Sequence, residues 1–195
     1  MKGKIIVLVG LVLILAGLLW HAALIEESTH AANEVQKLVP QLQKHISEQS
    51  LKEQKPEEPT LAPRVMKETI VDGTPYVGVL EIPKLKLELP VISFWSGENG
   101  KIAPCRYSGS VYLDDMILCA HNYDSHFGEL NQLNVGDPVQ FTDIDGTVFS
   151  YLMQEAMTLE STDVEKIRDG DWDLILFTCT PGGKMRYVVT CIKNS

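Results

Sequence analysis

The hydrophobic and polar positions of the chain follow three patterns, one after another. Ile5 to Ile25 is an apolar run that contains no charged residue, with only the ionisable His21 inside it. Residues 26–54 are mostly polar, and from about Met66 onward short apolar runs alternate with glycines, prolines and polar turns. This pattern predicts an apolar helix within residues 1–25, a helical stalk and linker over 26–65, and a folded domain over 66–195.

The first apolar run is long enough to cross a membrane. Its 21 residues would rise about 31 Å as a helix, which matches the hydrocarbon core of a bilayer. Lys2 and Lys4 on its short N-terminal side predict that this end is cytoplasmic and that the rest of the chain lies outside. A cleaved signal peptide is the alternative, but its apolar region is usually shorter. We expect an uncleaved, single-pass signal-anchor in the cell membrane.

The polar segment after the anchor carries a narrow apolar stripe at helical spacing. Val35, Leu38, Leu42 and Ile46 recur three, four and four residues apart. Pro40 within the stripe predicts a kink or an interruption. The stalk either touches a partner helix or is a solvated spacer, which we slightly prefer. Residues 55–63 hold three prolines and predict an extended, semi-rigid linker.

The remainder of the chain is rich in short β-type runs. Short helices are expected around Phe127 to Leu133 and Thr162 to Ile167. Many short strands with brief turns indicate an all-β sandwich or barrel. The predicted strands are Tyr76 to Ile82, Leu85 to Ile92, Val111 to His121, Pro138 to Thr142, Thr147 to Leu159, Leu174 to Cys179 and Arg186 to Ile192.

The charge of the chain excludes some partners. The formal net charge of −9 becomes −11 once Lys2 and Lys4 are set aside. An acidic external domain argues against binding of nucleic acid and against electrostatic docking on anionic lipid.

Cys105, Cys119, Cys179 and Cys191 lie in the part of the chain that we expect outside the cytosol. An even number of cysteines there permits disulfides, although spacing does not give their connectivity. No C-x-x-C pair indicates a metal or redox site. For each cysteine except Cys179, a small core residue is the preferred interpretation.

Cys179 lies in a predicted hairpin. Two apolar runs flank Pro181-Gly182-Gly183, a turn signal between antiparallel strands. If Thr180 pairs with Met185, Cys179 faces Arg186 across the ladder. A permanent cation beside a thiol favours the thiolate and can also hold an oxyanion. A buried structural cysteine near a surface arginine is the alternative.

A histidine supplies the missing partner for this thiol. His121 ends a predicted apolar strand, where a rigid element can present a side chain to a cleft. His126 lies in the following loop and is the weaker candidate. Together with Cys179 and Arg186, both also at predicted strand ends, His121 favours a catalytic site over a set of structural residues.

Three segments resemble the sortase family, the membrane-anchored cysteine transpeptidases of Gram-positive bacteria. The resemblance covers roughly Tyr76 to Ile192, and the family's order of His, Cys and Arg and its N-terminal signal-anchor agree with this chain. The segments are Val77-Gly78-Val79-Leu80-Glu81-Ile82-Pro83-Lys84 with Leu89-Pro90-Val91, Ala120-His121-Asn122, and Phe177-Thr178-Cys179-Thr180-Pro181 with Arg186 downstream.

The resemblance implies a closed, roughly eight-stranded sortase-like β-barrel and a defined chemistry. Cys179 would attack the Thr–Gly bond of an LPXTG-like sorting signal on a surface protein and form an acyl-enzyme. His121 would act as general acid and base, Arg186 would stabilise the oxyanion or the substrate, and Thr178 would help to hold the substrate or shape the site. The accepting amine would come from a peptidoglycan precursor or a pilin.

Other functions stay open at this point. A cysteine endopeptidase or hydrolase of the same fold would resolve the acyl-enzyme with water, and a non-catalytic barrel would only bind peptides. The chain has no Asp-Pro-aromatic lid segment ahead of the barrel, which weakens assignment to the pilin polymerases. No cofactor or metal is expected. Calcium would need a carboxylate cluster, and the scattered acids are expected to be solvated: Asp114, Asp115, Glu129, Asp143, Asp145 and Glu155.

Overall fold

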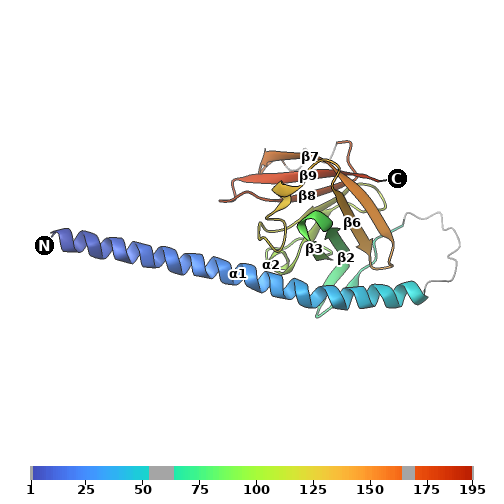
Figure 1. The fold of residues 1–195 in the computed structure, drawn as a ribbon. Helices are drawn as coiled ribbons and strands as arrows, with labels where there is room; N and C mark the ends of the chain where they lie inside the picture. The colour runs from blue at the N-terminus through green and yellow to red at the C-terminus, as the bar shows by residue number, and fades with distance from the viewer. Residues whose placement is uncertain (1, 53–63, 164–169, 195) are drawn as a thin grey trace.

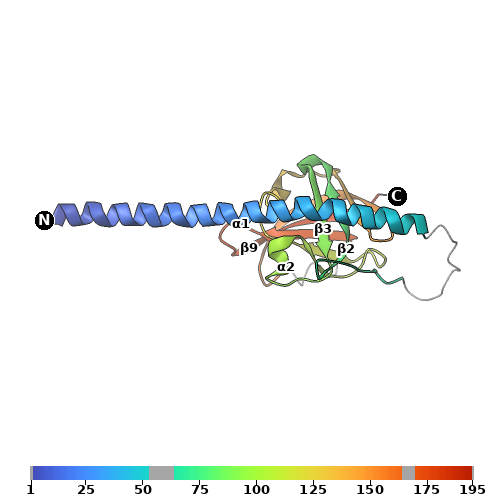
Figure 2. The same cartoon turned by 90° about the horizontal axis from the view of Figure 1, so that it is seen from below.

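The computed structural model describes residues 2–52, 64–163 and 170–194. It consists of one long helix, α1 (Lys2–Lys52), and a β-barrel that lies against the C-terminal half of this helix (Figure 1). Seen from below, the helix crosses the whole width of the barrel, and its N-terminal half extends beyond it (Figure 2). The predicted proline-rich linker, residues 55–63, lies outside the described ranges.

Helix α1 runs through Pro40 without a break, so the predicted interruption is wrong. Proline lacks the N–H that would bond to the carbonyl of Gln36. Both residues are exposed, so water is available to that carbonyl. The apolar part from Ile5 to Ile25 is exposed except at Gly10, and by length and composition it is able to cross a membrane.

The second half of α1 packs on the barrel of its own chain. Val35, Leu38 and Leu42 of the predicted stripe are buried there, as is Ala31 one turn earlier. A solvated spacer is therefore the wrong interpretation, and the surface that covers the stripe belongs to the barrel instead of a partner helix. Burial of such an apolar stripe is what stabilises a surface helix.

The barrel is closed and has eight strands, which confirms the predicted all-β class. The strand order is β2-β3-β4-β5-β8-β9-β7-β6, and pairing of β6 with β2 closes it, while short β1 adds to β2. The strands are β1 (Thr69–Val71), β2 (Thr74–Ile82), β3 (Leu87–Ile92), β4 (Cys105–Ser108), β5 (Met116–Cys119), β6 (Pro138–Asp143), β7 (Val148–Glu160), β8 (Leu174–Cys179) and β9 (Met185–Lys193).

Short helical segments connect some of these strands. They are the 3-10 turns η1 (Pro83–Leu85) and η2 (Leu130–Gln132) and the four-residue helix α2 (Asn99–Ile102). Helix η2 falls in one predicted helical region, and the other, Thr162 to Ile167, lies mostly outside the described residues.

One predicted strand is too long, and two observed strands were not predicted. Strand β5 is shorter than the predicted Val111 to His121, because a turn stabilised by the bond from the Ser110 N–H to Asp115 Oδ1 (2.8 Å) comes first. Asp114 in this turn adopts a left-handed conformation with φ of 56°. Strands β1 and β4 are not predicted, because each is short and has exposed or polar positions.

Strand β8 is apolar from Leu174 to Phe177 because both of its faces are covered. Leu174 and Leu176 belong to one buried cluster, and Ile175 and Phe177 belong to another. A strand with two buried faces shows no alternation of polar and apolar residues. The strand that ends in Cys179 is therefore held rigidly by packing on both sides.

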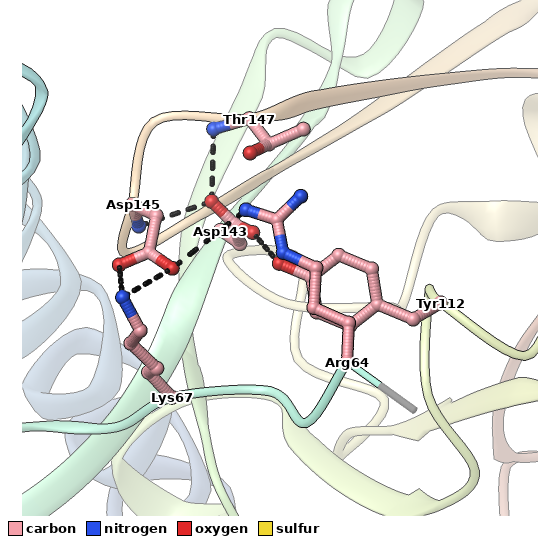
Figure 3. A network of polar contacts seen from close by, with 6 residues as sticks. All are labelled: Arg64, Lys67, Tyr112, Asp143, Asp145 and Thr147. Atoms are coloured by element: carbon pink, nitrogen blue, oxygen red, sulfur yellow. Dashed lines mark hydrogen bonds and ion pairs between the residues drawn. The ribbon is translucent and has the colours of Figure 1, made fainter. Parts of the chain in front are cut away.

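A polar network fastens the segment before β1 to the turn between β6 and β7 (Figure 3). Asp143 is 3% exposed and accepts hydrogen bonds from the hydroxyl of Tyr112 and from the N–H groups of Asp145 (3.0 Å) and Thr147 (2.8 Å). Lys67 Nζ lies 3.1 Å from the Asp145 carboxylate, and the Arg64 guanidinium lies 4.7 Å from the Tyr112 ring centroid. From the sequence, Asp143 and Asp145 are expected to be solvated loop acids. That expectation is wrong, because both carboxylates are bonded to protein donors.

Candidate active site

Strand pairing brings three predicted site residues to one end of the barrel. Strands β5 and β8 are parallel, with Cys119 opposite Phe177. His121 and Cys179 each come two residues after this pair, so they lie at the same end of the two strands. Cys179 pairs with Arg186 across the β8–β9 hairpin, and the Thr180 N–H bonds to the Met185 carbonyl at 3.0 Å. The predicted register of this hairpin is confirmed.

These three side chains line one pocket of about 180 Å³. Two of them come from the ends of β5 and β8, and Arg186 comes from the start of β9. The other lining residues are mainly apolar or aromatic: Trp95, Tyr107, Cys119, Ala120, Ser161 and Phe177. Tyr107 and Phe177 pack edge to face with ring centroids 5.4 Å apart, which fixes part of the wall.

The thiol of Cys179 is accessible, unlike those of the other cysteines. Cys179 is half-buried, whereas Cys105, Cys119 and Cys191 are buried, and all four are free. Burial raises the pKa of Cys105 and of Cys191 to about 12, and it also raises the pKa of Cys119. These three thiols are therefore protonated at neutral pH, which agrees with the preferred core interpretation and leaves Cys179 as the candidate nucleophile.

The imidazole of His121 is held between two aromatic rings. Its ring centroid lies 5.7 Å from that of Trp95 and 5.1 Å from that of Tyr123. Burial lowers the pKa of His121, the nearby carboxylate of Glu27 opposes this change, and the ammonium of Lys101 adds to it. A neutral imidazole is thus favoured over the imidazolium at neutral pH.

The guanidinium of Arg186 is oriented by its own hairpin. Nη1 donates to the carbonyl of Gly183 at 3.0 Å and to that of Met185 at 3.1 Å. Within the described part of the chain, Nε and Nη2 make no hydrogen bond. The arginine is thus fixed on one side and has donors available for a ligand on the other.

The hydroxyl of Thr178 links the two strands that carry Cys179 and His121. It is 4% exposed and donates to the carbonyl of Ala120 at 2.9 Å. Each end of this bond lies one residue before a predicted catalytic residue. Thr178 does not line the pocket, so its geometry suits shaping of the site more directly than contact with substrate.

His126, the weaker histidine candidate, lies outside the pocket. It is fully buried, and burial, with a smaller contribution from His121, lowers its pKa to about 4. Its ring centroid is 5.4 Å from that of Tyr123, whose ring in turn packs on His121.

Sequence reasoning missed the aromatic walls and the contribution of α1. The exposed pair Phe94 and Trp95 directly after β3 was a signal for Trp95, since large exposed aromatics often mark binding sites. No local signal connects Glu27 to His121, because they are 94 positions apart.

No metal site is evident among the residues that the structure describes. These ranges contain no group of three or more His, Cys, Asp or Glu side chains that could hold an ion. Asp143 and Asp145, two of the acids considered as calcium ligands, are bonded to protein donors.

Comparisons with known proteins agree with this geometry. The family model of the sortase domain matches residues 80–194. Similar solved structures include Streptococcus pneumoniae sortase C, at 20% identity and a TM-score of 0.59 over 82% of this chain and 97% of that chain. Streptococcus agalactiae sortase C1 is 24% identical, with a TM-score of 0.56 over 65% and 71% of the two chains.

A Clostridium perfringens sortase D5 transpeptidase is 17% identical, with a TM-score of 0.54 over 62% of this chain and 79% of that chain. No curated protein matches the sequence. The matched family segment covers more than half of the chain and includes β5, β8, β9 and the pocket between their ends. The chain therefore belongs to the sortase family.

Proposed function

We propose that the protein is a cysteine transpeptidase that cleaves an LPXTG-like sorting signal between Thr and Gly and joins the new carboxyl end to an amine. The proposal rests on one observation: Cys179, His121 and Arg186 line a single pocket at the strand ends. Trp95, Tyr107 and Phe177 in the same pocket offer apolar surface that suits the leucine and proline of such a signal.

In the first half-reaction, the Cys179 thiolate attacks the carbonyl carbon of the threonine. The C–S bond forms, the carbonyl electron pair moves to oxygen, and Arg186 stabilises that oxyanion. The intermediate then collapses, the C–N bond to glycine breaks, and the His121 imidazolium gives its proton to the leaving amine. A thioester and a neutral imidazole remain.

In the second half-reaction, an acceptor amine attacks the thioester. His121 takes a proton from this amine, the C–S bond breaks, and the Cys179 thiolate leaves. The new amide carries the protein onto its acceptor, and the enzyme returns to its starting charges. Arg186 meets an oxyanion in both halves.

The starting state needs a proton on His121. Burial lowers the pKa of His121, so the imidazolium is the minor form at neutral pH. We expect a bell-shaped pH profile of kcat/KM that reports the two macroscopic pKa values of the coupled pair.

The proposed substrates follow from where the domain would work. With the apolar half of α1 as a single-pass anchor and Lys2 and Lys4 on the cytoplasmic side, the barrel meets proteins as they are exported. The Streptococcus pneumoniae sortase C structure is described in terms of pilin substrate specificity. The acceptor amine proposed here is that of a peptidoglycan precursor or a pilin lysine.

The test incubates the full chain, in detergent or nanodiscs, with LPXTG-type peptides, with and without triglycine. Mass spectrometry should detect an acyl adduct on Cys179 and, with triglycine, the ligated product. Cys179→Ala should give neither. A varied peptide library that yields no difference between wild type and Cys179→Ala would contradict enzymatic activity and favour a peptide-binding barrel.

The same experiment decides the second candidate. A cysteine hydrolase of the same fold would form the adduct on Cys179 and release only the free acid, whether or not an amine is present. Ligated product that increases with triglycine concentration excludes that outcome.

A further inference from the structure

Trp95 lies in a short loop between β3 and α2 that is held in place by its own hydrogen bonds. The side-chain amide of Asn99 donates to the carbonyl of Phe94 at 3.1 Å, and the Asn99 N–H donates to Ser96 Oγ at 3.0 Å. The Gly100 N–H donates to the carbonyl of Ser96 at 2.9 Å. The residues on both sides of Trp95 are therefore bonded, and the backbone that carries the indole is fixed.

The indole of Trp95 lies directly on the backbone of Gly100. A Cβ atom added to Gly100 would stand 2.5 Å from Cη2 of the indole and closer still to Cζ3. Carbon atoms in contact are usually about 3.5–4.0 Å apart, so a side chain at this position cannot share the space with the ring. Gly100 is buried within α2 and is not among the glycines with positive φ. Glycine is thus needed here for the close approach of the indole, and not for the backbone conformation.

The backbone of α2 is less able to move than the indole. Ala103, directly after α2, is fully buried, and Ile102 packs against the same buried cluster. Trp95, by contrast, is 39% exposed. If Gly100 carried a side chain, the indole would therefore be displaced while α2 stayed in place.

The same indole packs on the imidazole of His121. The two ring centroids are 5.7 Å apart with an interplanar angle of 60°, which is within the range of favourable aromatic pairs. Both rings line the pocket that contains Cys179. Among the described residues no hydrogen bond orients the imidazole, so its contacts with Trp95 and Tyr123 restrict its rotation.

We propose that Trp95 is a positioning residue that holds His121 in the orientation needed for proton transfer, and that Gly100 sets the place of its indole. The proposal rests on the function proposed above for Cys179 and His121. It gives a role in the site to the loop and helix after β3, which carry none of the reacting groups. Gly100 does not line the pocket, so a change there reaches the reaction through a neighbour.

Gly100→Ala should displace the indole and leave His121 less restricted, although it alters no residue that lines the pocket. A misplaced proton donor slows the chemical step, so we expect kcat for the sorting peptide to fall about tenfold. Gly97→Ala is the matched control in the same loop. A Cβ at Gly97 would have no atom within 4 Å, and Gly97 also lacks a positive φ, so kcat should not change.

A smaller ring at position 95 separates this effect from damage to the fold. Trp95→Phe keeps an aromatic ring that ends closer to the backbone, so this variant alone should lose only about threefold in kcat. Added to Trp95→Phe, Gly100→Ala should cost nothing further, because the smaller ring leaves room for the methyl group. Equal losses from Gly100→Ala in both backgrounds would show that it acts through the fold and would overturn the proposal.

The kinetic experiment uses the full chain in nanodiscs, and a second readout does not depend on activity. In a Cys179→Ala background, NMR of labelled histidine reports the His121 ring, which senses the ring current of a neighbouring indole. Gly100→Ala and Trp95→Phe should each change the His121 resonances, and Gly97→Ala should not.

Two results would contradict the role of Trp95. They are unchanged His121 resonances in Trp95→Phe, which leaves α2 intact, and a kcat of Gly100→Ala equal to that of the wild type. If no peptide forms an adduct with the wild type, the proposed function fails. The NMR spectra then still decide whether Gly100 and Trp95 hold His121.

Discussion

Two polar clusters on this barrel differ in how completely their groups are bonded. In the network around Asp143, the carboxylate accepts three hydrogen bonds, and the neighbouring Asp145 carboxylate lies beside Lys67 and Arg64 (Figure 3). In the pocket, by contrast, the described residues provide no hydrogen bond to the thiol of Cys179 or to the ring of His121.

This difference separates structural polar groups from reactive ones. A buried carboxylate is stable in a fold when its acceptor sites are occupied, which is the case for Asp143. A thiol and an imidazole that line a pocket without partners can form new bonds to a ligand. Charged residues alone do not identify a site, since both clusters contain them.

The largest effect should come from breaking the bonded cluster. Asp143→Ala leaves the Tyr112 hydroxyl and two backbone N–H groups without their acceptor, so we expect a loss of about 3 kcal/mol in the free energy of unfolding. Urea denaturation followed by tryptophan fluorescence measures it. The control is Asp124→Ala, at an exposed position. Equal losses in both variants would show that the hydrogen bonds of Asp143 add nothing to the free energy of unfolding.

His126 belongs to neither cluster and should make stability depend on pH. It is buried and neutral in the fold with a pKa of about 4, whereas the unfolded chain protonates it near 6.5. Its contribution is therefore complete above about pH 6.5 and is lost as the pH falls to about 4, by about 3 kcal/mol.

Urea midpoints measured from pH 7 to pH 4 test this prediction. The His126→Gln variant should remove most of the decline that occurs in this interval, and the exposed His45→Gln should not. If the wild type and His126→Gln lose stability in parallel, another group is responsible for the acid sensitivity.

Arg186→Lys tests whether the pocket needs the shape of the guanidinium or only its charge. Lysine keeps the charge and loses the planar fork, so we expect kcat/KM for the sorting peptide to fall about thirtyfold. Arg106→Lys is a matched control, because Arg106 also bonds to two backbone carbonyls but does not line the pocket. Near-normal turnover in Arg186→Lys would leave only a charge role.

The smallest effect should come from the bond between the ends of β5 and β8. Thr178→Val removes the hydroxyl that reaches Ala120 and should cost about 1 kcal/mol of stability. It should also lower kcat severalfold, because the ends of β5 and β8 are no longer held together at His121 and Cys179. Thr190→Val, another buried threonine bonded to a carbonyl, should affect stability alone.

The parts of the site that were predictable from the sequence are those with local signals. The turn at Pro181-Gly182-Gly183 sets the register that pairs Cys179 with Arg186, and the end of an apolar strand identifies His121. The family resemblance then gives the barrel. These features depend on short stretches of neighbouring residues, so they can be recognised in a single sequence.

The parts that were not predictable depend on packing between distant elements. The stripe on α1 shows that some surface covers Val35 and Leu38, but it does not say that this surface is the barrel. The burial of Asp143 depends on Tyr112, which is 31 positions away. Glu27 reaches Lys101 only because α1 docks along the barrel.

The unbroken course of α1 also has a mechanical consequence. Glu27, which lies 3.8 Å from Lys101 on α2, is only two residues past Ile25, where the apolar run ends. A helix rises about 1.5 Å per residue, so under the proposed topology the edge of the barrel at α2 stands within about one helical turn of the lipid headgroups. With this topology the helix would set the height of the barrel above the membrane, and proteins held in the same membrane would reach it by lateral diffusion.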